Sequence, residues 1–155
     1  MRKGVIILYL LLGSVFAHPE SPIFSSNDLN VTLKTVTENK KIHVYLTIRN
    51  KKNEACYIPF WYLNFYCEED GEQTMKNDWL RIIDEKNKIV PYYGLISNPI
   101  KKWETSDCFF LAKEQEYIIS LYDIQSNYLF PKTKRITIKY YGPLGESNVV
   151  KLKLK

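Results

Sequence analysis

The feature that most constrains the fold is a strict alternation of apolar and polar side chains. Residues 42–49 read Ile-His-Val-Tyr-Leu-Thr-Ile-Arg, so every second side chain is aliphatic. Successive side chains of an extended strand point to opposite faces of a sheet. This period of two therefore predicts a strand with one face in the core and the other in solvent.

The same alternation recurs along the chain. Further stretches are rich in aromatic and β-branched residues, which also favour strands. Together these predicted strands cover residues 29–33, 42–49, 57–66, 79–83, 88–93, 108–111, 116–122, 135–140 and 150–155. Turn-forming sequences such as Asp70-Gly71, Asn98-Pro99 and Gly142-Pro143 separate them. Outside the amino-terminal apolar segment no window has helical spacing, so we expect little helix.

Short strands without intervening helices indicate antiparallel pairing. The sequence predicts an all-β fold over residues 29–155, an immunoglobulin-like antiparallel β-sandwich of about eight or nine strands, with residues 18–28 as an N-terminal arm. A closed barrel is the competing architecture. Tyr128, after Asp123-Ile124, is expected to pack at a corner and to hydrogen-bond nearby backbone.

The first seventeen residues predict a secretory signal peptide. They combine Arg2 and Lys3, an apolar run over residues 5–12 and the ending Val15-Phe16-Ala17, with cleavage expected after Ala17. The mature chain would begin at His18 and would be secreted or periplasmic, with no stable membrane insertion.

The charge pattern argues against nucleic acid as a partner. Removing residues 1–17 lowers the formal net charge from +5 to +3, and the lysine pairs are scattered among acidic residues. A nucleic-acid interface would need a basic stripe on one surface.

Three cysteines enter an oxidising compartment, which favours at least one disulfide. Cys56, Cys67 and Cys108 allow three pairings, and the sequence does not choose among them. A catalytic thiol is not expected, because no histidine is near any of them in sequence.

Short motifs follow in a specific order from residue 80 onward. They are Arg81-Ile82-Ile83-Asp84, Val90-Pro91-Tyr92-Tyr93-Gly94, Lys101-Lys102, Asp107 to Leu111, Asp123-Ile124, Tyr128 and Arg135 to Tyr141. This order resembles the N-terminal non-catalytic β-sandwich domain of deuterolysin-like and peptidyl-lysine metalloendopeptidases. The resemblance implies an accessory module that acts beside a peptidase.

The chain departs from that family at the zinc site. Those proteases use a His-Glu-x-x-His motif, in which two imidazoles hold the metal and the glutamate activates water. Here His43 is followed by valine and His18 by proline. We therefore expect the accessory module alone, without a catalytic zinc domain: no enzyme, no catalytic residue and no cofactor.

Two binding sites remain as candidates. The aromatic-rich segment 57–66 predicts a surface for a protein partner at Trp61, Tyr62 and Tyr66, unless both faces of that strand are covered. The alternative is a copper site, in which the N-terminal amine and imidazole of His18 join His43 around Cu(II). The expected function is thus a secreted binding module that associates with or modulates a secreted peptidase or another extracellular protein.

Overall fold

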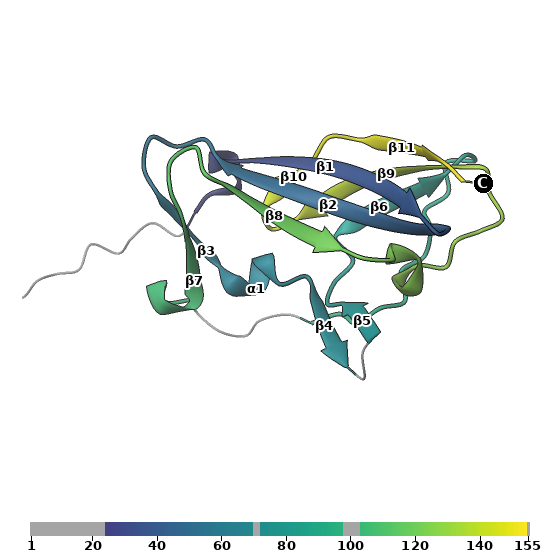
Figure 1. The fold of residues 1–155 in the computed structure, drawn as a ribbon, viewed down its shortest axis with the longest axis horizontal. Coiled ribbons are helices and arrows are strands. Elements are labelled where there is room, and N and C mark those ends of the chain that lie inside the picture. Colours follow the sequence, from purple (N-terminus) through teal and green to yellow (C-terminus); the bar gives the residue numbers. More distant parts are fainter. Residues whose placement is uncertain (1–23, 70–71, 98–102, 155) are drawn as a thin grey trace, which may run out of the picture.

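The computed structural model describes residues 24–69, 72–97 and 103–154 and has an all-β architecture of antiparallel ladders (Figure 1). The predicted signal peptide and His18 lie outside these residues. The described part contains eleven strands, more than the eight or nine expected, because the predicted strand 57–66 divides in two and two short strands, 72–75 and 145–146, lie outside the predicted ones. The elements are η1 (Ser26–Asp28), β1 (Leu29–Glu38), β2 (Lys41–Asn50), β3 (Cys56–Pro59), α1 (Phe60–Leu63), β4 (Tyr66–Glu69), β5 (Glu72–Met75), β6 (Leu80–Asp84), η2 (Thr105–Asp107), β7 (Cys108–Leu111), β8 (Glu116–Leu121), η3 (Ile124–Asn127), β9 (Arg135–Gly142), β10 (Gly145–Glu146) and β11 (Val150–Lys153).

One sheet has the order β1-β2-β8 and lies at the front in Figure 1. A two-residue turn joins β1 to β2, and both turn residues, Asn39 and Lys40, have positive φ, which suits the twist of a tight hairpin. The alternation predicted for residues 42–49 is confirmed in β2, because its aliphatic side chains are all buried: Ile42, Val44, Leu46 and Ile48.

The second sheet is centred on β9. Strand β6 pairs with one side of β9, and β11 and β10 pair with the other. Its inward side chains include Ile82, Ile136, Ile138 and Tyr140, and together with those of the first sheet they form a single apolar core.

Tyr128 occupies this core at the end of η3. Only 2% of its surface is exposed, and its hydroxyl lies 3.0 Å from the Leu80 carbonyl oxygen and 2.8 Å from Asp78 Oδ1. The hydroxyl is therefore bonded to backbone as expected, but to a carbonyl of β6 rather than to one close by in sequence. Burial raises the pKa of this phenol, as does the Asp78 carboxylate beside it.

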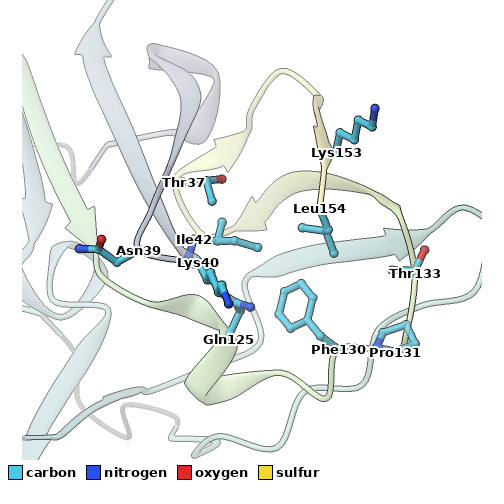
Figure 2. Close-up of a pocket in the computed structure, with 10 residues that line it drawn as sticks. All are labelled: Thr37, Asn39, Lys40, Ile42, Gln125, Phe130, Pro131, Thr133, Lys153 and Leu154. Carbon is cyan, nitrogen blue, oxygen red and sulfur yellow. Dashed lines mark hydrogen bonds between the residues drawn. The ribbon is translucent and has the colours of Figure 1, made fainter.

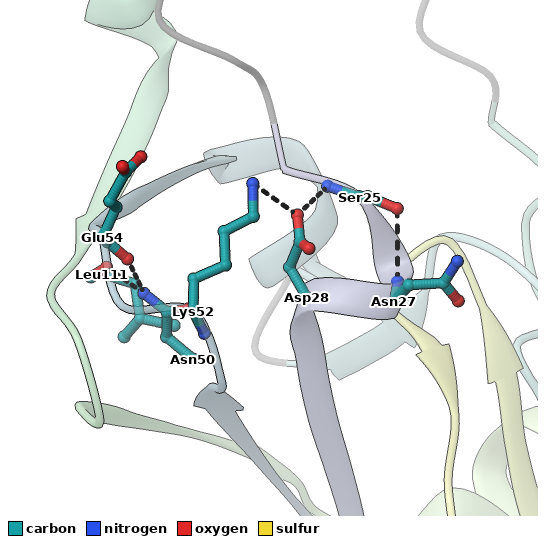
Figure 3. A network of polar contacts seen from close by, with 7 residues as sticks. All are labelled: Ser25, Asn27, Asp28, Asn50, Lys52, Glu54 and Leu111. Carbon is teal, nitrogen blue, oxygen red and sulfur yellow. Dashed lines mark hydrogen bonds and ion pairs between the residues drawn. The ribbon is translucent and has the colours of Figure 1, made fainter.

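A short β3–β7 ladder continues the β2–β8 ladder beyond a hinge at Asn50 (Figure 3). Asn50 is fully buried, and its side-chain amide donates to the carbonyl oxygens of Glu54 at 2.8 Å, Leu111 at 3.0 Å and Ala112 at 3.2 Å. Its Oδ1 accepts from the Lys52 backbone N–H. One polar side chain thus pairs the backbone groups that the break between the ladders leaves without strand partners.

The end of the predicted N-terminal arm is fastened to this hinge. Asp28 accepts from the Ser25 backbone N–H and pairs with the Lys52 ammonium at 3.0 Å (Figure 3). These two interactions, the backbone hydrogen bond first, lower the pKa of the Asp28 carboxyl.

Two predicted strands differ from the observed structure. The segment 57–66 is interrupted by the helical turn α1, and 88–93 contributes only isolated bridges at Ile89 and Tyr92. Each contains a proline, Pro59 or Pro91, which has no backbone N–H to donate to a ladder. The helices of the described part are single turns, far short of the about 20 apolar residues that a membrane span requires.

Candidate functional site

Aromatic side chains gather around α1 and the β3–β7 ladder. Phe60 and Phe110 are each 52% exposed, although both are large and apolar. We call the group the aromatic surface and define it as Phe24, Tyr57, Phe60, Trp61, Tyr62, Trp103, Phe109 and Phe110. The other six rings are half-buried, and a group of partly exposed aromatic rings is a candidate contact surface, whereas single exposed apolar residues need no explanation.

Edge-to-face contacts hold most of these rings in place. Tyr62 contacts both Phe24 and Trp103 with centroids 6.0 Å apart. Tyr57 lies 5.6 Å from Phe110, its register partner across the ladder, and Phe60 lies 6.4 Å from Phe109. The arrangement is therefore ordered by the rings themselves.

The local sequence explains which rings face outward. In β3 the alternation buries Cys56 and Ile58 and leaves Tyr57 half-buried. Pro59 then ends the strand, and the helical turn that follows exposes Phe60 and buries Leu63. Phe65 returns to the core, where it stacks 5.5 Å from Tyr140.

Trp61 carries the most informative polar atom of this surface. Its indole Nε1–H is buried, and no hydrogen-bond acceptor lies within reach of it in the described structure. The Lys76 ammonium lies 4.7 Å from the centre of its ring, a cation–π contact that fixes the indole. A buried donor without an acceptor costs about 1–3 kcal/mol, which the packing of the indole ring must offset.

The structure brings together two of the three aromatic residues singled out from the sequence. Trp61 and Tyr62 both lie in α1 and are half-buried, whereas the side chain of Tyr66, in β4, is outside the described part. Sequence reasoning missed Trp103, Phe109 and Phe110, which lie forty or more residues away from α1. The register of β3 with β7 brings Phe109 and Phe110 to it, and Trp103 contacts Tyr62.

His43, the described half of the candidate copper site, lies on β2 and is half-buried. Its Nδ1 accepts a hydrogen bond from the Asp123 backbone N–H at 3.3 Å, and its ring contacts Tyr122 edge-on. The neutral ring therefore carries its proton on Nε2, and Nε2 could bind a metal only if this hydrogen bond to Nδ1 were lost. Among the described residues, no three His, Cys, Asp or Glu side chains come together as a metal site would require.

The expected disulfide is not formed in the structure. Cys56 and Cys108 are free thiols, and they lie at opposite ends of the β3–β7 ladder, opposite Leu111 and Pro59 respectively. Three register steps along a strand exceed the about 7 Å Cα separation that a disulfide can bridge. The Cys67 side chain lies outside the described part. Burial raises the pKa of both described thiols, which lowers their reactivity at neutral pH.

A separate cavity of about 460 Å³ lies at the far end of the first sheet, near the β1–β2 turn (Figure 2). Ile42, Phe130 and Leu154 supply apolar walls, and Lys40 and Gln125 are among the polar lining residues. Gln125 uses its Oε1 to accept from the Ile42 backbone N–H, while Lys153 points away from the other lining residues. The volume would suit a small molecule, but few polar groups converge on it, so it supports no specific ligand.

No model of a known protein family matches the chain, and no curated protein matches it.

Proposed function

We propose that this protein is an exported, non-catalytic binding domain with an immunoglobulin-like β-sandwich fold, and that it binds another extracellular protein through the aromatic surface. The observation that carries the proposal is the exposure of Phe60 and Phe110, each 52%, within an ordered group of aromatic rings.

The chemistry of this surface favours a protein partner. Tyrosine, tryptophan and phenylalanine rings give a large contact area with little loss of side-chain entropy. The Lys76 ammonium over Trp61 adds a positive charge beside the rings. A partner segment with an apolar side chain and an exposed carbonyl or carboxylate oxygen would satisfy both features.

Two sequence features indicate where such a partner is found. The predicted signal peptide at residues 1–17 supports export, and the resemblance to the accessory domain of deuterolysin-like metalloendopeptidases supports a peptidase as partner. A binding role rather than a catalytic one is further supported by the buried thiols and their raised pKa values.

Photo-cross-linking tests the proposal directly. Phe60 is replaced by p-benzoylphenylalanine and the protein is exposed to the proteins secreted by its own host, with the same replacement at Leu129 as control. Leu129 is 59% exposed but lies outside the aromatic surface. We expect one discrete product from position 60 and none from position 129.

A competition step links that product to the aromatic surface. Excess unlabelled wild-type protein should abolish the product, whereas excess Phe60→Ala/Phe110→Ala double variant should not. Equal labelling from both positions, or equal competition by both proteins, would contradict the proposal. Mass spectrometry of the product then tells a peptidase from another secreted protein.

Copper binding by His18 and His43 is the second candidate function, and it requires the His43 ring to give up the hydrogen bond that its Nδ1 accepts, so that Nε2 can bind the metal. The proposal requires His18 as the first residue of the mature chain. Calorimetric titration with Cu(II) should show tight 1:1 binding that is lost both in His43→Ala and when one residue is added before His18. Unchanged binding by either variant would exclude this site.

A further inference from the structure

The two edges of the β1-β2-β8 sheet differ in whether their backbone groups are paired. Strand β1 forms one edge and β8 the other, and β8 is the outermost strand of this sheet in Figure 1. An edge strand offers unpaired backbone N–H and C=O groups to any other chain. Which groups are offered follows from the register of each ladder.

At the β1 edge these groups are already paired within the chain. Leu33 donates its N–H to Asn148 Oδ1 at 2.7 Å, and its carbonyl accepts from Asn148 Nδ2 at 3.1 Å. Val31 forms a bridge with Ser147 beside it. The Asn148 amide thus takes the place of a neighbouring strand.

At the β8 edge the register leaves four residues with outward backbone groups. Asn50 donates to the Gln115 carbonyl opposite it, so alternate residues from Gln115 onward direct their backbone groups toward β2. Glu116, Ile118, Ser120 and Tyr122 then direct theirs outward. No strand of the described residues pairs with that side of β8.

The sequence of this edge lacks the usual protection. Monomeric proteins commonly place lysine, proline or a bulge on an open edge strand. Residues 117–122 read Tyr-Ile-Ile-Ser-Leu-Tyr, with neither charge nor proline. Ile118 is 59% exposed and Tyr122 is 50% exposed on the outer side.

We infer that β8 pairs with β8 of a second copy of this chain, so that two three-stranded sheets join into one continuous antiparallel sheet. The occupant is a second copy because the strand is complementary to itself. With Ile119 opposite the partner's Ile119, each outward residue finds an outward residue. Ile118 then lies opposite the partner's Ser120, and Glu116 opposite the partner's Tyr122, whose hydroxyl is a donor for a carboxylate.

This pairing opposes no like charges, and Glu116 is the only charged residue of the strand. The area buried by one pair of strands is small, so we expect a reversible dimer whose population rises with protein concentration. The inference is independent of the proposed function, because it uses none of the eight residues of the aromatic surface.

Sedimentation velocity of the exported protein over a range of concentrations tests the inference, with two matched variants. Ile118→Lys and Ile89→Lys each replace an exposed isoleucine by lysine, but Ile89 lies beside β6 on the other sheet. We expect wild type and Ile89→Lys to dimerise alike. Ile118→Lys should raise the dissociation constant at least about tenfold, because it brings two like charges to the centre of the pairing.

Both substituted side chains are exposed, so both variants should keep the fold, and circular dichroism checks this. A wild-type protein that stays monomeric at every concentration would overturn the inference. So would a dimer that Ile118→Lys leaves intact, or one that both variants weaken equally.

Discussion

The two edge strands of one sheet share one pattern of residues, but the backbone groups along their outer sides are paired at one edge and open at the other. Both β1 and β8 alternate inward apolar and outward side chains, and both pair with β2. Yet the backbone of β1 is closed by Ser147 and Asn148, while that of β8 is open among the described residues. The difference comes from segments distant in sequence, so edge exposure is a tertiary property.

The open edge also has a different neighbourhood from the closed one. The ladder that ends in β8 continues through the Asn50 hinge into β3–β7, where the aromatic surface lies. The closed edge instead contacts Ser147 and Asn148, which lie between β10 and β11. Both binding proposals, the protein partner and the second copy, therefore use exposed apolar residues of the β2–β8 ladder or of its continuation β3–β7.

The largest effect is expected at the hinge of the open-edge ladder. Asn50→Ala should lower the free energy of unfolding by about 3 kcal/mol, because three carbonyl oxygens lose their donor in a buried place. Urea denaturation measures this. Asn53→Ala, an exposed change in the same turn, should stay within about 0.5 kcal/mol; a similar loss from both would contradict the role of Asn50.

Next in size is the removal of the closure at β1. Asn148→Ala should cost about 1–2 kcal/mol and should speed hydrogen exchange at the Leu33 amide, since that amide loses its acceptor. Val149→Ala, at an exposed neighbour, serves as the control. If the Leu33 amide stayed protected in Asn148→Ala, another group would have to close this edge.

Tyr140 supports the segment that contains Ser147 and covers the β1 edge, and the protonation of this tyrosine can be tested. Tyr140 is buried in β9, its hydroxyl accepts from the Leu144 N–H, and its backbone N–H donates to Ser147 Oγ. Burial raises the pKa of its phenol, which stays neutral in the folded chain. The resulting stability is fully present below the unfolded pKa of about 10 and is lost as pH rises above it.

Denaturation at several pH values checks this titration. Above pH of about 10 the stability of Tyr140→Phe should fall less steeply than that of wild type, by up to about 1.4 kcal/mol per pH unit. Between pH of about 7 and 9 the two proteins should respond to pH alike. Parallel curves at alkaline pH would show that Tyr140 does not contribute.

The smallest effect is expected from the ion pair at the start of the open edge. Arg49 and Glu114 are paired, but about half of each side chain is exposed. Glu114→Gln should change the free energy of unfolding by less than about 0.5 kcal/mol, and less still at high salt. A loss above 1.4 kcal/mol, about a tenfold change in the unfolding constant, would mean that this pair holds the edge in place.

The sequence predicted those strands that have one face in the core. Residues 42–49 and 135–140 lie in β2 and β9, because burial imposes a period of two. Residues 108–111 and 116–122, predicted from their aromatic and β-branched composition, match β7 and β8 within one residue. The Asn50 hinge and the Asn148 closure could not be read in this way. Their partners are Leu111 and Leu33, 61 and 115 residues away. The sequence around an asparagine does not indicate which distant backbone carbonyl its side chain will bond.

The aromatic surface was predictable only in part for the same reason. The crowding of rings in 57–66 pointed to α1, but Trp103 and Phe110 join it through the β3–β7 register and the chain leading to β7. The aromatic composition of 57–66 favours a strand throughout, but Pro59 has no backbone N–H to continue the ladder, and the helical turn α1 follows it.

Amide hydrogen exchange at the two edges, measured by NMR in dilute and in concentrated protein, tests the central claim most directly. We predict that Leu33 is protected at both concentrations, while Ile118 and Ser120 exchange fast when dilute and slowly when concentrated. Tyr117 and Ile119, whose amides point toward β2, should remain slow throughout. Fast exchange at Leu33, or rates at Ile118 and Ser120 that do not change with concentration, would contradict a sheet closed at one edge and paired through the other.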